Sequence, residues 1–389
     1  MRLLYHHRTQ GKGAEGVHIR EIIRALELRG HSVYIVSPPG IDLRKDDNLQ
    51  SQKQRIARLK RLWRFISLHI PQVIFEFLEF VYNFYAVFVI FWKIIRFKIN
   101  GIYERMSFFC WAGTFCAKVF HIPLIIEVNE ISGIQRVRSQ RFVSFAQQIE
   151  LFVFTNASVV IAVSSFLKRK ILERNVSKHK VFVLPNGINP QQFRKQPEDI
   201  FLKKRLFIDQ KLVVGFVGVF VNWDNLEKLL EVFNNIRNKG GDIYMLLVGD
   251  GSNRVNLENR LLELNLSRYV VITGFVSREK VRDYISCMDI CVLPSSNSFG
   301  SPIAMFEYMA MSKPVVVPNV EPVLDVVTDR VNSLVFENGN FQDLEKKICE
   351  LIENPAMRRE IGEAGSTLVL KKYTWEHNAL CISALFEKK

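Results

Sequence analysis

The chain has 389 residues, enough for two domains, and its content of 48% hydrophobic and 24% charged residues is that of a globular, soluble protein. Its net charge of +14 is uneven, because residues 1–200 hold 30 Lys and Arg against 15 Asp and Glu while the rest is close to neutral. This basic half indicates an anionic partner. Because the sequence has no zinc-ligand spacing, RNA-binding signature or lysine-rich tail, a membrane surface is favoured over nucleic acid.

The six cysteines include no C-x-x-C pair and have no histidine cluster beside them. They are predicted to be reduced core residues in a reducing compartment. The start of the chain lacks the long apolar stretch of a secretory signal peptide. We therefore expect a cytoplasmic protein that can also attach peripherally to the inner face of the cell membrane. The sequence predicts no oligomeric state.

The first predicted elements form a βαβ unit. Leu3–His6 is a short apolar strand, Val17–Leu28 has helical spacing, and Ser32–Val36 is a second strand that ends at two prolines. This order is typical of a parallel sheet with a helix across it.

Two unusual segments follow. Residues 52–69 have the spacing of a basic amphipathic helix, which could lie in a membrane headgroup layer or cover a protein core. Residues 73–99 are highly apolar, but their uninterrupted apolar run before Lys93 is only 9 residues, against the roughly 20 that a span needs. We therefore predict a buried or interfacial helix at 73–99, not a membrane span.

Strands and helices then alternate to the end of the second half, with a polar stretch at 190–210 as a plausible linker. The alternation predicts an α/β fold with two Rossmann-like parallel sheets facing across a cleft. The later strands are predicted at Ile102–Arg105, Leu124–Val128, Val159–Val163, Val181–Leu184, Val213–Val217, Tyr244–Val248, Val270–Thr273, Ile290–Leu293 and Pro314–Val317.

A glycine-rich loop lies between the first strand and the first helix. Gly11, Gly13 and Gly16 match G-x-G-x-x-G around Lys12 and Glu15. Small residues there let backbone N–H groups approach an anion at a helix N-terminus. A dinucleotide site would also need an acidic residue at the end of the second strand, where the chain reads Val-Ser-Pro. Contact with an anionic substrate and a simple tight turn both remain open.

A second candidate follows the strand that ends at Leu293. Ser301 is predicted as the N-cap of a helix and Pro302 as its first residue. The free N–H groups and dipole of such a helix start favour a diphosphate. Glu307, nearly two turns into the helix, could accept hydrogen bonds from a ribose diol, although an ordinary helix with a surface glutamate would have the same spacing.

The stretch PSSNSFGSPIAMFEYMAMSKPVVV, residues 294–317, resembles the donor-site signature of glycosyltransferase family 4, which runs through S-P-x-K into a helical F-E-Y-M-A-x-G-x-P-V-V. Other segments resemble the same family in order along nearly the whole chain. They are the N-terminal loop and helix from Arg8, VFVLPNGIN at Val181–Asn189, LLVGDG at Leu246–Gly251, the strand-loop-helix-strand from Gly274, and Tyr373-Thr374-Trp375.

The resemblance implies a GT-B fold with an acceptor-binding domain at 1–195, a nucleotide-sugar domain at 205–371 and a returning helix at 372–389. It further implies a UDP- or GDP-linked sugar donor, a glycan or lipid-linked acceptor, retention of anomeric configuration, and neither a metal nor another cofactor. Glu307 would bind the ribose, and backbone N–H groups around the segment Gly300, Ser301, Pro302 and Ile303 would hold the sugar and phosphates. The remaining implied contacts are Gly218, Gly274, Phe275 and Val276 on the donor side, and Gly11, Lys12, Gly13, Glu15, Gly16 and His18 on the acceptor side.

The sequence departs from the family pattern at cationic and acidic positions. Phe299 stands where E-x7-E has its first Glu, and Ala304 stands where S-P-x-K has its Lys. The stretch Gly218–Asn225 lacks the usual Arg and Lys, and Asn129 replaces a frequent His. A leaving diphosphate needs positive charge or aligned dipoles, so Lys12 or Arg8 is a candidate substitute.

No catalytic residue is identified, and the candidates are Asn129, Glu130 and Lys12. Because two-carboxylate chemistry has no clear pair here, we expect the acceptor hydroxyl to attack on the face that the nucleotide leaves, with the departing phosphate taking the proton. A catalytically silent scaffold is the main alternative, and a nucleotide-sugar epimerase with the same fold is a weaker one.

Overall fold

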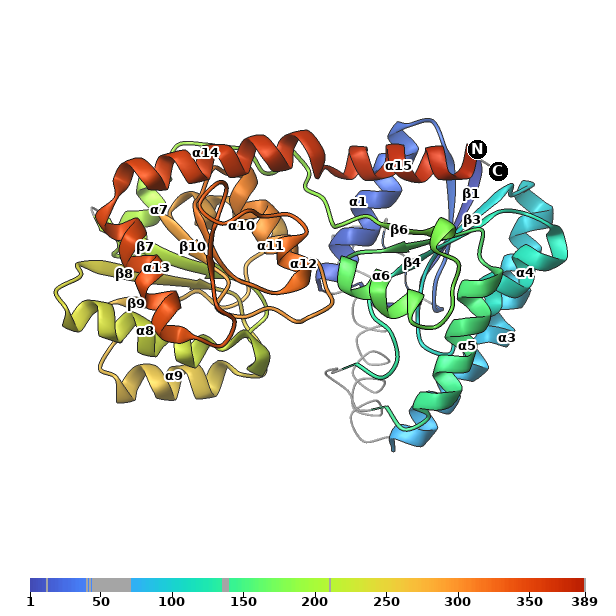
Figure 1. Cartoon of the computed structure of the whole chain (residues 1–389), viewed down its shortest axis with the longest axis horizontal. Coiled ribbons are helices and arrows are strands. Elements are labelled where there is room, and N and C mark those ends of the chain that lie inside the picture. Colours follow the sequence, from blue (N-terminus) through green and yellow to red (C-terminus); the bar gives the residue numbers. More distant parts are fainter. Residues whose placement is uncertain are drawn as a thin grey trace, which may run out of the picture. The chain divides into compact units, whose positions relative to one another are not determined.

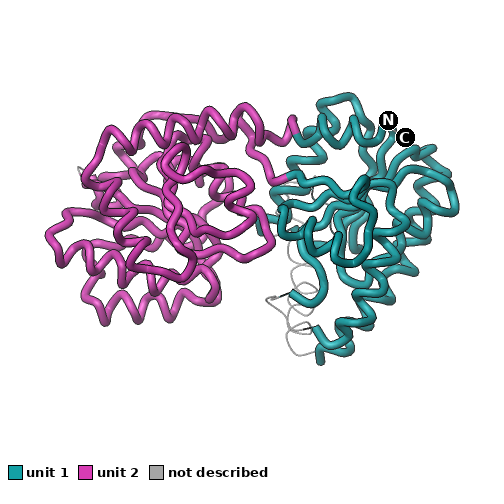
Figure 2. The backbone as a smooth tube through the Cα atoms, in the orientation of Figure 1, with its two compact units in different colours: residues 1–184, 378–389 teal, residues 185–377 magenta. Residues whose placement is uncertain are grey.

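The computed structural model describes residues 1–11, 13–39, 41, 43, 71–134, 140–209 and 211–387. The predicted basic helix 52–69 and Lys12 lie outside the described residues. The chain forms two compact units, one of residues 1–184 with 378–389 and the other of residues 185–377 (Figure 2). The sequence had placed the domain limits at 195, 205 and 371.

Unit 1 contains a six-stranded parallel sheet in the order β2-β1-β3-β4-β5-β6 (Figure 1). Its residues are nearly all apolar between the strand ends, because both faces of a parallel sheet are covered. The strands are β1 (Arg2–His6), β2 (Ser32–Val36), β3 (Gly101–Arg105), β4 (Leu124–Val128), β5 (Val159–Ala162) and β6 (Val181–Val183).

The helices of unit 1 connect these parallel strands, as crossover connections must. The longest, α3, has 26 residues and is apolar enough to cross a membrane by composition, yet only 22% of its most apolar window is buried. In sequence order they are α1 (Ala14–Leu28), α3 (Gln72–Phe97), α4 (Ala112–Phe120), α5 (Val143–Asn156) and α6 (Ser165–Leu172), with a 3-10 turn at Lys178–Lys180.

Unit 2 contains the second parallel sheet, in the order β12-β11-β10-β7-β8-β9. Two parallel Rossmann-like sheets are what the strand-helix alternation predicted, and β12 is a sixth strand beyond the five predicted for this one. The strands are β7 (Leu212–Val217), β8 (Ile243–Val248), β9 (Val270–Ile272), β10 (Ile290–Val292), β11 (Val315–Pro318) and β12 (Leu334–Phe336).

The helices of unit 2 surround one continuous apolar core that includes all six strands. They are α7 (Ile200–Arg205), α8 (Leu226–Asn238), α9 (Arg254–Glu263), α10 (Arg278–Ser286), α11 (Ile303–Ala310), α12 (Glu321–Leu324), α13 (Phe341–Glu353) and α14 (Pro355–Lys372), with a 3-10 turn at Asn222–Asp224. The last helix, α15 (Trp375–Glu387), begins in unit 2 and ends in unit 1, where Ser383 Oγ and His31 Nε2 are hydrogen-bonded at 2.8 Å.

The predicted linker at 190–210 is wrong in part. Phe193, Leu202 and Ile208 are buried in the core of unit 2, and α7 lies between the first and the last of them. Charged residues separate these apolar positions in the sequence, so a short amphipathic helix has the composition of a linker.

Candidate active site

The strand order of unit 2 reverses between β7 and β10, and in open α/β sheets ligands bind beyond the carboxyl ends of the strands at this reversal. Residues 218–225 follow β7, and residues 293–302 follow β10 into α11. The two segments that the sequence assigned to the donor therefore leave the sheet at adjacent strands.

The loop before α11 is held in place by side chains on both sides. Asn297 Oδ1 accepts hydrogen bonds from the backbone N–H groups of Phe299, at 3.1 Å, and Gly300. Asn186, in the predicted Pro-Asn-Gly segment, donates its backbone N–H to Ser301 Oγ at 3.1 Å and its side-chain amide to Ser301 O at 2.6 Å. The loop is thus a fixed platform rather than a free connection.

The start of α11 differs by one residue from the prediction. Pro302 is the N-cap and Ile303 the first helical residue, whereas the sequence favoured Ser301 and Pro302 for these positions. The hydroxyl of Ser301 is engaged by Asn186 instead of capping the helix. Within the described residues, no side-chain cap hydrogen bond is made at the start of α11, where the first helical N–H groups lack intrahelical acceptors.

Glu307 is buried on α11 and forms an ion pair with Arg278, the first residue of α10. Burial raises the pKa of Glu307, and the Arg278 guanidinium opposes that rise. Arg278 also lies 4.6 Å from the centroid of the Phe193 ring, while its buried Nε has no hydrogen-bond partner among the described residues. A buried donor without an acceptor indicates a place that a polar ligand could complete.

The remaining donor-side residues lie at the same edge of this sheet. Gly218 follows β7 and is half-buried, and a Cβ on Gly249, after β8, would lie 1.9 Å from Gly218 O. Gly274 pairs with Gly249 in an isolated bridge. Phe275 is largely exposed, whereas Val276 packs against the core of unit 2. An exposed ring at a strand end can stack on a nucleotide base.

An acidic group occupies the segment after β7, where the family usually has cations. Burial raises the pKa of Asp224 to about 7, opposed by a hydrogen bond from the backbone of Val221. Burial raises the pKa of Tyr308 on α11, and the charge of Asp224 adds to this rise. The hydroxyl of Tyr308 accepts from Val217 N at 2.6 Å, which joins α11 to the end of β7.

We expect nucleotide affinity to fall as the pH rises through 7. Ionised Asp224 would repel a diphosphate bound beyond β7, and protonation would remove that repulsion. Between pH 6 and pH 8 the UDP affinity should drop about tenfold more in the wild type than in Asp224→Asn, which is 1.4 kcal/mol. Isothermal titration of both proteins at each pH measures this. Identical pH profiles would show that the diphosphate does not approach Asp224.

In unit 1 the strand order reverses between β1 and β3, and a buried polar cluster lies at the ends of β3 and β4. Glu127 is its centre and is buried. Its carboxylate accepts hydrogen bonds from Tyr103 OH and from Arg105 at 2.9 Å, and pairs with His18 Nε2 at 2.8 Å. Burial alone would raise the pKa of Glu127, but His18, Arg105 and Tyr103 together hold it well below its ordinary value.

The same carboxylate fixes the orientation of Asn129. Asn129 donates its side-chain amide to Glu127 Oε1 at 2.6 Å. Because the NH₂ end faces a carboxylate, the carbonyl oxygen of Asn129 is left as the group to accept a hydrogen bond from a substrate. Glu130, the next candidate, is half-buried. The structure thus brings His18 and Asn129 together through Glu127.

Gly11 and Gly16 of the glycine-rich loop approach each other closely at the start of α1. A Cβ on Gly16 would lie 2.0 Å from Gly11 O, so this close approach requires glycine. Gly13 is the N-cap of α1, and its N–H donates to Glu15 Oε1 at 3.1 Å. Glu15 therefore occupies one of the donors that the sequence offered to an anionic ligand.

On the opposite face of the same sheet, His6 Nδ1 and Glu104 Oε2 lie 2.7 Å apart, and Tyr82 OH lies 3.2 Å from His6 Nε2. His6, Glu104 and Cys110 place three metal-type ligand atoms within 4.8 Å of one another. The Glu104 carboxylate also approaches the backbone of Gly113, at the start of α4. A helix N-terminus favours a carboxylate, while Glu104 Oε1 is buried without a hydrogen-bond partner among the described residues.

Arg278, Glu127, Tyr103 and Arg105 are site residues that were not predicted from the sequence. A signal was present for three of them, since Tyr103, Arg105 and Glu127 are polar residues inside runs predicted as buried strands, and a buried charge needs a partner. Arg278 starts an ordinary surface-type helix, so its pairing with Glu307 depends on tertiary structure alone.

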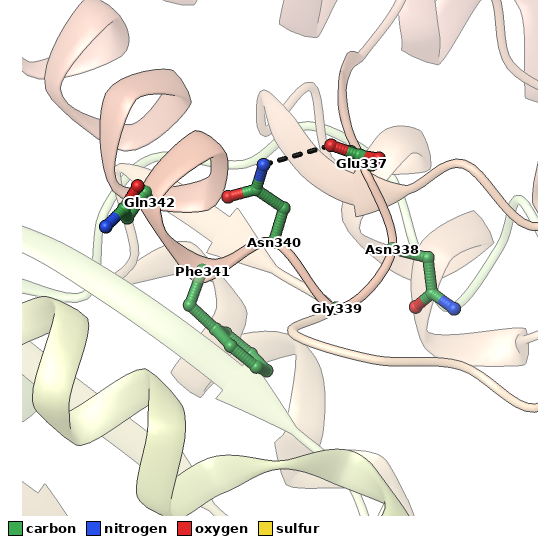
Figure 3. Close-up of a pocket in the computed structure, with 6 residues that line it drawn as sticks. All are labelled: Glu337, Asn338, Gly339, Asn340, Phe341 and Gln342. Atoms are coloured by element: carbon green, nitrogen blue, oxygen red, sulfur yellow. Dashed lines mark hydrogen bonds between the residues drawn. The ribbon is translucent and has the colours of Figure 1, made fainter.

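A shallow hollow lies at residues 337–342, between β12 and α13 (Figure 3). Asn340 in this hollow caps the N-terminus of α13, because its Oδ1 accepts a hydrogen bond from the N–H of Asp343 at 3.0 Å. Its Nδ2 donates to Glu337 at 3.0 Å. It lies at the edge strand β12, away from the β7–β10 reversal.

Comparison with known proteins divides the chain into two matched parts. Residues 198–367 match the family described as "Glycosyl transferases group 1", and residues 15–192 match "Glycosyltransferase Family 4". An uncharacterized glycosyltransferase of Methanocaldococcus jannaschii is 30% identical over 239 residues, which is 61% of each chain. The capsular polysaccharide biosynthesis glycosyltransferase CapM of Staphylococcus aureus is 27% identical over 92% of this chain and 91% of its own.

Among solved structures, Anabaena HepE in complex with UDP has a TM-score of 0.76 at 16% identity, with all of both chains covered. At this identity the likeness shows the fold. The two family matches are complementary, and the match at 198–367 includes the reversal between β7 and β10. The chain is therefore a glycosyltransferase, a member of glycosyltransferase family 4 with the GT-B fold.

Proposed function

We propose that this enzyme transfers a sugar from a UDP- or GDP-linked donor to a hydroxyl of a glycan or lipid-linked acceptor, with retention of anomeric configuration, in the assembly of a cell-surface polysaccharide or glycolipid. The observation that carries the proposal is in unit 2, where the uncapped start of α11 and the buried Glu307 lie on one helix beside the strand reversal. Glu307 would bind the ribose, and the N–H groups after Gly300 would bind the diphosphate.

The comparisons support the donor class and the pathway class. HepE has been solved with UDP and with UDP-glucose, and CapM is named for capsular polysaccharide biosynthesis. CapM matches over nearly its whole length, so the similarity extends to both units.

The negative charge of the diphosphate needs positively charged partners, and the segment Gly218–Asn225 lacks the Arg and Lys that the family usually has there. In unit 2, Arg278 lies beside Glu307, and Arg254 NH1 would lie 3.1 Å from a Cβ on Gly274. Both guanidinium groups belong to helix starts near strand ends, and guanidinium is well suited to phosphate oxygens. These two arginines and the α11 N–H groups would together stabilise the leaving nucleotide.

We further propose that the acceptor attacks on the face that the nucleotide leaves and that the departing phosphate oxygen takes the proton. Asn129 would then position a substrate hydroxyl by accepting its hydrogen bond, because its amide is held by Glu127. No enzymic nucleophile and no divalent metal enters this scheme. The six free cysteines are in keeping with a cytoplasmic location.

We expect the purified enzyme to keep its rate after treatment with a chelator and to form a product with the anomeric configuration of its donor. A screen of UDP- and GDP-sugars, with proton NMR of the fresh product, measures both. An inverted product would contradict the proposed attack, and a rate that collapses in chelator and returns with Mg²⁺ or Mn²⁺ would contradict the metal-free scheme. Absence of both UDP and GDP binding by titration would contradict the donor class itself.

A further inference from the structure

An apolar surface covers one side of unit 1. The helices α3, α4 and α5 lie side by side there (Figure 1). On α3, exposed apolar side chains recur every three or four residues and form a single stripe along the helix. We call this stripe and its continuation the aromatic face. On α3 it consists of Phe77, Val81, Phe84, Phe88, Trp92 and Ile95.

The aromatic face continues onto the neighbouring helices. The ring centroids of Phe84 and Trp111 are 6.1 Å apart, and those of Trp111 and Phe115 of α4 are 5.9 Å apart. Phe80 contacts Phe145 of α5 at 5.7 Å, and both Phe115 and Phe145 are exposed. A patch that spans three helices is larger than the scattered exposed apolar residues of a soluble protein, and such patches mark interaction sites.

The inner side of α3 is fixed to unit 1 by buried hydrogen bonds. Glu76 accepts the backbone N–H groups of Arg141, at 2.7 Å, and Phe142, at 2.9 Å. Asn83 accepts from Trp111 N at 2.8 Å and donates to Phe109 O at 2.7 Å. Crossing a bilayer would break all of these bonds and leave a carboxylate in hydrocarbon. The helix therefore presents one face outward while the other stays in the protein.

The charges around the aromatic face are positive. Lys93, Arg96 and Lys98 lie at the C-terminal end of α3, and Lys118 lies on α4 with its Nζ 5.7 Å from the centroid of the Phe152 ring. Both carboxylates of α3 are engaged elsewhere, Glu76 inward and Glu79 with Arg8 at 2.6 Å. An apolar face with lysine and arginine at its edge is the pattern of a segment that lies in a membrane interface and contacts anionic headgroups.

We infer that the aromatic face docks unit 1 on the surface of a lipid bilayer that contains anionic lipid, with α3 lying in the interface plane. Its aromatic rings would enter the boundary between headgroups and acyl chains, and the basic residues would reach the phosphates. This inference does not depend on the donor, but it would bring the enzyme to a lipid-linked acceptor of the class proposed above.

Vesicle sedimentation of the full chain tests this surface. We expect the wild type to sediment with vesicles of phosphatidylcholine containing phosphatidylglycerol and much less with phosphatidylcholine alone. The variant Phe77→Ser/Phe88→Ser, which removes rings that are 62% and 74% exposed, should lose at least tenfold in partitioning. The matched control Phe201→Ser/Phe207→Ser, at 87% and 84% exposure in unit 2, should partition as the wild type does.

UDP titration of the same variants separates this test from that of the donor site in unit 2, and urea unfolding followed by a probe in unit 1 shows whether the Phe77/Phe88 variant is folded. Equal sedimentation of the Phe77/Phe88 variant and the wild type would overturn the inference. So would a vesicle-free dimer, detected by light scattering, that dissociates in the Phe77/Phe88 variant alone, since a second copy would then cover this surface. Lys93→Gln/Arg96→Gln/Lys98→Gln should reduce the preference for anionic vesicles, and an unchanged preference would contradict the role of these charges.

Discussion

Replacing Glu307 with alanine is expected to weaken UDP binding by at least 100-fold, about 2.7 kcal/mol. The carboxylate would lose two hydrogen bonds to the ribose diol, and hydrogen bonds to a charged group contribute about 1.5–3 kcal/mol each. Burial raises the pKa of Glu307 and favours its neutral form, and the Arg278 guanidinium opposes this shift and favours the ionised acceptor. Isothermal titration with UDP measures the loss, and transfer rates at saturating acceptor follow it.

A matched control for this change is Glu345→Ala. Glu345 is also a buried, ion-paired glutamate of unit 2, but it lies on α13 and pairs with Lys239. It should leave UDP affinity unchanged. Arg278→Ala should weaken UDP binding less than Glu307→Ala does. Equal UDP affinity of Glu307→Ala and the wild type would show that Glu307 does not bind the ribose.

The second large effect concerns the folding of unit 1. Removing one member of a buried charged cluster costs about 3–5 kcal/mol of unfolding free energy, because the partner charge stays buried and unpaired. Glu127→Ala leaves Arg105, His18 and Asn129 without their common acceptor. We therefore expect a loss of this size in urea unfolding followed by a probe in unit 1.

Two comparisons check this explanation. Glu173→Ala removes an exposed carboxylate that pairs with Arg169 and Lys170, and such surface pairs contribute little, so unfolding should not change measurably. The pH dependence has a defined sign. Because the folded pKa of Glu127 is below its unfolded value near 4.3, its stabilisation is complete at neutral pH and is lost as the pH falls below about 5. A Glu127→Ala protein as stable as the wild type at pH 7 would show that the cluster is neutral to folding.

Most of the fold follows from local patterns in the sequence. Each predicted strand is present, because buried parallel strands appear as short apolar runs between turn residues. The three-residue β12 was not predicted, since Leu334–Phe336 is too short to distinguish from an apolar turn. The segment around α7 was predicted as a linker because three core residues are spread among charges.

The site residues were predictable only where they are close together in the sequence. The loop and helix at 300–307 form one segment, so strand end, helix start and acidic residue could be placed from spacing. The Glu307–Arg278 pair and the cluster of His18, Glu127 and Asn129 join residues far apart in the sequence, and neighbouring strands decide which of them meet. The aromatic face was foreseen as an apolar helix, but which side of it is exposed depends on the inward hydrogen bonds of Glu76 and Asn83.

The central claim is that α11 binds the nucleotide, with its first N–H groups at the diphosphate and Glu307 at the ribose. A crystal structure of the chain with UDP tests it directly. We expect ribose hydroxyls within hydrogen-bond distance of the Glu307 carboxylate and a phosphate oxygen at the backbone of residues 300–303. Density for UDP elsewhere in the chain, with Glu307 still closed against Arg278 and no contact to α11, would contradict it.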